Sequence, residues 1–167
     1  MFNNILLIRF GLNKLKIRKI KKFNWLAIFA GAVACFFLGF LWYGVLFLDT
    51  WAAGNGLELD KVAEKMSRNG VEIPMSSAPM IINILAILFF SYFMHWLQNK
   101  IGGRSLNNWL SLGVMIGVVM FLGIMTGNLF AANPISLTMV DGSYTFITWV
   151  LLGLIIGAWP QKKIDQQ

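Results

Sequence analysis

Residues 135–159 read ISLTMVDGSYTFITWVLLGLIIGAW and form an apolar run that carries a single acid, Asp141. A helix of about 20 apolar residues is long enough to cross the hydrocarbon core of a bilayer. The run therefore predicts a transmembrane helix. An ionisable side chain at membrane depth is costly and usually has a function, so Asp141 is the first candidate for a functional residue.

Three more apolar runs precede this one, and none contains Asp, Glu, Lys or Arg: residues 25–48, 78–97 and 108–130. The chain is 57% hydrophobic and 13% charged, whereas a soluble domain has about 25% charged residues. This composition predicts an all-α, polytopic membrane protein. We expect a four-transmembrane-helix bundle with residues 24–160 as its membrane domain.

The chain has a formal net charge of +7, and its basic residues gather at the ends of the apolar runs. This distribution predicts binding to the membrane surface and not to nucleic acid. Residues 1–23 hold seven Lys or Arg residues and no acid. Their spacing predicts a basic amphipathic helix that lies on the anionic lipids of the cytoplasmic leaflet. The alternative is that this segment only sets the orientation of the chain. Residues 161–167 are expected to form a cytoplasmic tail.

The polar loop at residues 49–76 is the largest connection between the apolar runs. Its second half predicts a short amphipathic helix over about 57–68, ended by the turn signal Asn69-Gly70. One face of that helix is outlined by apolar residues at the i, i+3, i+4 and i+7 positions: Leu59, Val62, Ala63 and Met66.

The distribution of basic residues predicts the orientation. With the N-terminus inside, the inner segments hold eleven of the fourteen Lys and Arg residues, and the outer loop holds the other three. Cytoplasmic segments carry an excess of Lys and Arg. We therefore expect a multi-pass protein of the bacterial cytoplasmic (inner) membrane with both termini in the cytoplasm.

Small residues recur every four positions along three of the runs. This spacing lets helix backbones approach closely in a membrane. It predicts close helix packing, within a compact bundle or on a self-associating face, at Ala27, Gly31, Cys35 and Gly39, at Gly113 and Gly117, at Gly123 and Gly127, and at Gly153 and Gly157.

Asp141 lies six residues after Ile135, about 9 Å along a helix, which places it in the outer third of the membrane. Other polar and aromatic residues are expected at the same end and form a candidate outward-open pocket with it: Trp42, Tyr43, Asn83, Asn128 and Tyr144. In this hypothesis Asn128 or Tyr43 donates a hydrogen bond to Asp141. The alternative is structural: the positive end of the helix favours an acid there, or a bond to Asn128 only joins two helices.

The remaining reactive side chains are weaker candidates. His95 is expected at the opposite side of the membrane, too far from Asp141 for a direct proton relay, and Cys35 reads as a packing residue. The sequence has no phosphate-binding loop, no metal-ligand spacing and no second acid within the spans. We therefore expect no catalysis, no metal and no cofactor.

Several short motifs occur together in order: Asn24-Trp25-Leu26, Gly39 with Trp42-Tyr43-Gly44, Asn128, and Asp141-Gly142-Ser143-Tyr144 followed by Gly153, Gly157 and Trp159. Through these motifs residues 24–159 resemble the membrane proteins of domain of unknown function 1761. The resemblance implies a bacterial four-helix membrane protein with no established activity. Thr145 stands where many members have His, which weakens the idea of an Asp–Tyr–His group for proton chemistry.

These observations favour a non-catalytic, packed helical bundle that acts as a scaffold or partner subunit, alone as a homo-oligomer or with another membrane protein. The alternative is a small homo-oligomeric transporter or channel that uses Asp141 as a cation- or proton-binding group. An enzyme acting on lipid or quinone at the outer surface is the least favoured reading.

Overall fold

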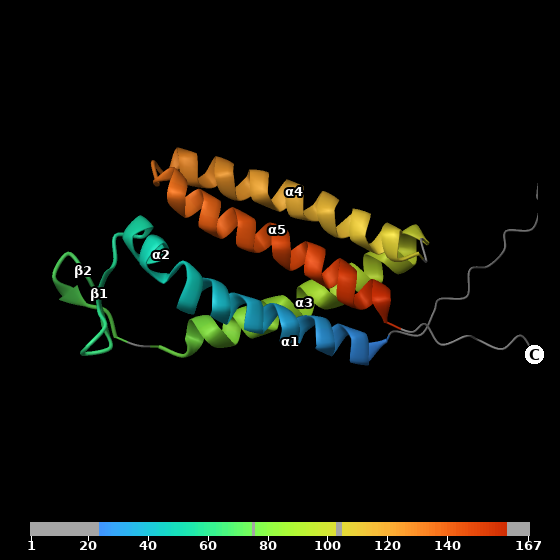
Figure 1. The fold of residues 1–167 in the computed structure, drawn as a ribbon, viewed down its shortest axis with the longest axis horizontal. Helices are drawn as coiled ribbons and strands as arrows, with labels where there is room; N and C mark the ends of the chain where they lie inside the picture. The colour runs from blue at the N-terminus through green and yellow to red at the C-terminus, as the bar shows by residue number, and fades with distance from the viewer. Residues whose placement is uncertain (1–23, 75, 103–104, 160–167) are drawn as a thin grey trace, which may run out of the picture.

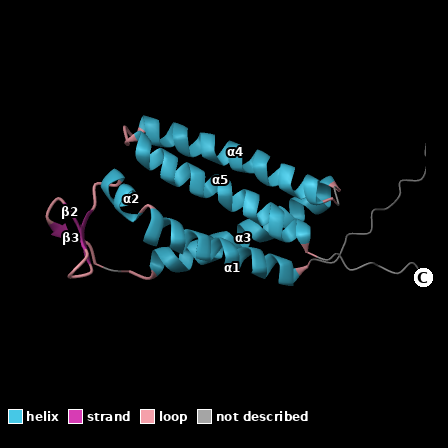
Figure 2. Ribbon diagram, in the orientation of Figure 1, coloured by secondary structure: helices cyan, strands magenta, loops and turns pink. Residues whose placement is uncertain are grey.

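The computed structural model describes residues 24–74, 76–102 and 105–159. The predictions for residues 1–23 and for the tail at 161–167 lie outside these residues. Most of the described chain is helical, and a small sheet and short loops make up the rest (Figure 2). Four stretches are long and apolar enough to cross a membrane, which confirms the four predicted spans: Trp25–Leu46, Ala78–Ile101, Leu106–Phe130 and Ile135–Ala158.

The long helices are α1 (Trp25–Leu41), α3 (Ala78–Ile101), α4 (Leu106–Phe130) and α5 (Ile135–Ala158). Helix α4 packs mainly on α5, and α1 packs on both α5 and α3 (Figure 1). Helices α3 and α4 share few contacts although they follow one another in the chain. The bundle is therefore open between α3 and α4, and α4 lies at its edge.

Helices α4 and α5 approach closely because each presents glycines to the other. A Cβ atom on Gly113 would lie 2.5 Å from the backbone oxygen of Trp149, and one on Gly153 would lie 2.6 Å from that of Trp109. Atoms do not come this close in real structures, so only glycine fits at these positions. The other glycines of these stripes divide into two groups. A Cβ on Gly31, Gly39, Gly117 or Gly157 would also meet side chains, whereas one on Gly123 or Gly127 would meet no atom of the described residues within 4 Å.

The sequence predicts a single span over 25–48. In the structure this stretch is not one regular helix, because its form changes near the end. A π-helix, η1 (Trp42–Leu46), follows α1, and the N–H of Phe47 donates to the carbonyl of Trp42 at 2.9 Å. Helix α2 (Leu48–Gly54) then begins in a new direction (Figure 1). Single π turns inside helices are frequent at functional sites, and this one positions Trp42 and Tyr43.

The prediction of a short helix over 57–68 is wrong, because these residues belong to a three-stranded antiparallel sheet. The strands are β1 (Glu58–Asp60), β2 (Lys65–Arg68) and β3 (Val71–Glu72). They form a small polar projection beyond α2 (Figure 1).

The turn chemistry explains why the sheet forms. Asn69 and Gly70 connect β2 and β3 with φ angles of 53° and 76°, and Asn-Gly is a strong signal for a two-residue hairpin turn. An isolated helix of this length is marginal in water. Leu59 and Met66 face each other across β1 and β2, so their match to a helical period was accidental, and Val62 is 97% exposed.

Candidate functional site at Asp141

Two side chains of η1 reach across to α5 and bond to consecutive residues. The Tyr43 hydroxyl donates to Oδ1 of Asp141 at 3.0 Å, and the Trp42 indole Nε1 donates to the carbonyl of Val140 at 3.0 Å. Trp42 and Tyr43 are the first two residues of the π-helix, and both direct their donor atoms to α5. Asp141 itself is half-buried.

Aromatic rings surround this contact. The ring of Tyr43 lies 4.9 Å from that of Tyr144 and 5.9 Å from that of Trp51, both edge to face, and the rings of Trp42 and Tyr144 are 6.5 Å apart. Such edge-to-face pairs are favourable beyond the area they bury. We call these five residues the Asp141 cluster: Trp42, Tyr43, Trp51, Asp141 and Tyr144.

A glycine on α1 makes room for this cluster. A Cβ atom on Gly39 would lie 2.9 Å from the Tyr144 hydroxyl oxygen. The small residue expected to let two helices approach therefore accommodates the tip of a tyrosine from α5. The helix packing and the cluster depend on the same residue, because Tyr144 can lie beside Tyr43 only if residue 39 has no side chain.

The six residues expected at this end do not all meet. Tyr43, Trp42, Tyr144 and Asp141 come together, but the Asn128 amide oxygen accepts a hydrogen bond from Asn133 at 3.0 Å. That bond closes the turn between α4 and α5, where the Asn133 N–H also donates to the Asn128 carbonyl at 2.9 Å. Asn83 is exposed on α3. Among the described residues, neither asparagine donates a hydrogen bond to Asp141.

Trp51 is the member of the cluster that is not among the six residues expected at this end. It lies in α2, where the chain takes a new direction, and its ring packs edge to face on that of Tyr43. The dense aromatic content around residues 42–51 was the available signal. The Thr145 hydroxyl donates to the carbonyl of Asp141 at 2.9 Å, and the Ser143 hydroxyl donates to the carbonyl of Met139.

His95 lies at the other end of the bundle. Its Nε2 accepts from the N–H of Asn24 at 3.4 Å, at the start of α1, and its ring packs on Trp109. Further polar contacts join the helices in between: the Ser91 hydroxyl donates to the carbonyl of Ile28 at 2.7 Å, and the Cys35 thiol lies 3.8 Å from the carbonyl of Thr148. In the part of the chain that the structure describes, no three His, Cys, Asp or Glu residues gather as a metal site would require.

The Asp141 cluster has two chemical capacities. A tyrosine-to-carboxylate bond between helices holds them in register, and bonds of this kind in membranes contribute about 0.6 kcal/mol on average. A half-buried carboxylate beside aromatic faces is also suited to a proton or a cation.

Comparison with known proteins gives the family but no activity. Searches of curated proteins and of solved structures found no match. A family model, described as "Protein of unknown function (DUF1761)", matches residues 26–157. This match covers all four spans and the whole Asp141 cluster. The chain therefore belongs to the DUF1761 family of proteins of unknown function.

Proposed function

We propose that this membrane protein is a non-catalytic helical bundle that works as a scaffold or partner subunit, and that it associates through α4. The observation that carries the proposal is a face of α4 that the chain covers at one end only. Trp109, Ile116 and Gly123 are each seven residues apart, so they lie near the same side of the helix.

This face is filled at one end of α4 and empty at the other. Trp109 belongs to the packed core and Ile116 packs against it, whereas a Cβ on Gly123 or Gly127 would meet no atom of the described residues within 4 Å. Of the four spans, α4 is the least covered. Exposed glycines four residues apart let a second helix approach closely, so a second copy or another membrane protein fits here.

The non-catalytic part of the proposal is supported by how the polar groups of the spans are used. Ser91, Trp42 and Tyr43 all direct their donor atoms to a neighbouring helix. Such bonds hold helices together in a membrane, where few other partners are present.

Replacing Gly123 and Gly127 together with leucine should weaken association of the chain. The added side chains would hold the partner helix away, and overpacking costs about 1–3 kcal/mol, which corresponds to roughly 5- to 150-fold in the dissociation constant. The measurement is energy transfer between labelled copies in vesicles at several protein-to-lipid ratios. Val118→Leu adds bulk elsewhere on α4 and serves as the control. A wild-type chain that stays monomeric and co-purifies with no membrane protein contradicts the proposal.

The same proposal places the protein in the bacterial cytoplasmic membrane with both termini inside. It is supported by the eleven-to-three division of Lys and Arg between the two sides. In this orientation the sheet at β1–β3 and the Asp141 cluster lie toward the outside, and His95 toward the cytoplasm.

A cysteine introduced at Val62 should react with a membrane-impermeant maleimide in intact cells, because Val62 is among the most exposed residues of the outer loop. A cysteine at Lys100, at the other end of α3, should react only after the cells are permeabilised. Native Cys35 is buried, so it gives little background. The reverse labelling pattern would invert the orientation.

The second candidate is a small homo-oligomeric transporter or channel that binds a cation or proton at Asp141. It is favoured by one observation: the only acid within the spans is half-buried next to Tyr43 and the aromatic rings of the cluster. This candidate differs from the first in requiring flux, and the variants that separate the two are Asp141→Asn and Tyr43→Phe.

A further inference from the structure

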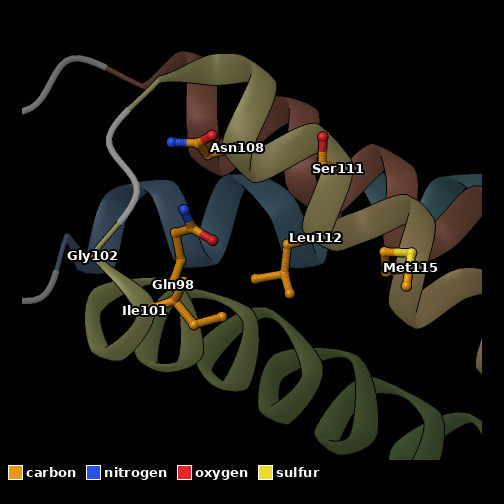
Figure 3. Close-up of a pocket in the computed structure, with 7 residues that line it drawn as sticks. All are labelled: Gln98, Ile101, Gly102, Asn108, Ser111, Leu112 and Met115. Atoms are coloured by element: carbon orange, nitrogen blue, oxygen red, sulfur yellow. The ribbon is translucent and has the colours of Figure 1, made fainter.

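A cavity of about 410 Å³ lies between the end of α3 and the start of α4, at the opposite end of the bundle from Asp141. It exists because α3 and α4 barely touch while each packs elsewhere. Figure 3 shows the residues that line it: Gln98, Ile101, Gly102, Asn108, Ser111, Leu112 and Met115. Its volume falls within the range of about 300–1,000 Å³ that is usual for small-molecule sites.

The lining changes from polar to apolar along α4. Asn108 and Ser111 come first, near the helix start, and Leu112 and Met115 follow deeper in the span (Figure 3). The distance from Asn108 to Met115 is about 10 Å along the helix axis. From α3, Gln98 adds an amide that is only 2% exposed. On the α4 side the lining is thus polar near the helix start and apolar toward the midplane, while on the α3 side Ile101 lies at the helix end and Gln98 one turn deeper.

We propose that this cavity binds one phospholipid from the leaflet on its side of the membrane. The amide of Asn108 and the hydroxyl of Ser111 can donate to phosphate and ester oxygens, and one acyl chain can lie along Leu112 and Met115. This order of groups matches the order of polarity within a phospholipid. Lys100 lies outside the lining, with its Nζ 5.9 Å from the centroid of the Trp96 ring, but it is exposed on the same last turn of α3 as Ile101. Its positive charge at this end of the bundle favours an anionic headgroup.

The polarity of the lining favours a lipid over a helix of a second copy. The apolar side chains of a spanning helix would leave Asn108 and Ser111 without acceptors, whereas a phospholipid brings acceptor oxygens to them. An acyl chain is also much thinner than a helix and can enter sideways between two spanning helices. The lining does not include Gly123 or Gly127. Lipid binding in the cavity can therefore be tested independently of association through α4.

The first test uses the full chain in vesicles of phosphatidylglycerol and phosphatidylcholine that contain a phosphatidylglycerol with a photoreactive acyl chain. Peptide mapping after illumination should find adducts concentrated at residues 108–115. Adducts spread evenly along the exposed side of α4 would show only general contact with the bilayer and would overturn the proposal. Failure of the cavity residues to react, because a second copy covers them, would overturn it too.

The second test fills the cavity. Ser111→Trp places a large ring at an exposed lining position, and Val119→Trp places the same ring on the exposed side of α4 outside the lining. The expected result is loss of phosphatidylglycerol retained through purification in mild detergent for Ser111→Trp and no loss for Val119→Trp. Equal retention by both variants contradicts the site. Asn108→Leu, which removes a donor at an exposed position, should lower retention as well and covers the case in which Ser111→Trp does not fold.

Discussion

Replacing Gly113 and Gly117 together with alanine should strongly destabilise the bundle. A Cβ on Gly113 would lie 2.5 Å from the Trp149 carbonyl oxygen, and one on Gly117 would lie 3.0 Å from that of Phe146. Because both obstacles are backbone atoms, α4 and α5 would have to move apart along their main contact. Overpacking of this kind costs about 1–3 kcal/mol at each site. The measurement is the free energy of unfolding, from titration of the micelle-bound protein with a denaturing detergent.

The chain provides a matched control for this experiment. Gly123 and Gly127 have the same spacing on the same helix, but a Cβ on either meets nothing within 4 Å. Alanine at both should leave the stability of the monomer unchanged or raise it slightly, since alanine is favoured over glycine within a helix by roughly 0.5–1 kcal/mol. An equal loss of stability in the two double variants would show that the close contact between α4 and α5 is not what holds them together.

The two glycine pairs also show what sequence can and cannot provide. Span positions follow from length and hydropathy, properties that each segment carries by itself. Both glycine pairs look alike in sequence, yet only Gly113 and Gly117 pack against another helix of the described chain. Which pair meets a neighbour depends on how α4 crosses α5, and that depends on residues such as Trp109 and Trp149 that are distant in sequence.

The candidate site was predictable to the same extent. Asp141, Tyr43, Trp42 and Tyr144 were expected at one end of the membrane, and depth can be counted from a span's start. Which side of the helix a side chain points to cannot be derived from residue number where the helix is irregular. The π-helix at Trp42–Leu46 departs from the 3.6-residue period, and the turn at α2 brings in Trp51. Asn128 has the right depth but bonds to Asn133 within its own turn.

Removing the bond between Tyr43 and Asp141 should separate the two proposed functions. If the bond only joins η1 to α5, Tyr43→Phe lowers the free energy of unfolding by about 1 kcal/mol. The same change in an Asp141→Ala background should cost less, because alanine cannot accept the bond, and the coupling should lie near the average of about 0.6 kcal/mol and below the maximum of about 1.7 kcal/mol measured for such bonds in membranes. A double-mutant cycle of unfolding free energies gives this coupling, and wild-type vesicles loaded with a pH-sensitive dye should show no cation-dependent proton movement.

If Asp141 instead carries a cation or proton, the flux assay gives a different pattern. Wild-type vesicles would then move protons in exchange for a cation, and Asp141→Asn would abolish this movement while the protein stays folded, because asparagine keeps the shape and can still bond to Tyr43. Tyr43→Phe would change the rate without abolishing it, since the carboxylate remains. Asp49→Asn is the matched control, as that acid pairs with Lys61 at 2.8 Å on the exposed loop and lies outside the cluster. Flux that survives Asp141→Asn, or is lost equally with Asp49→Asn, excludes Asp141 as the carrier, and the bond to Tyr43 is then structural.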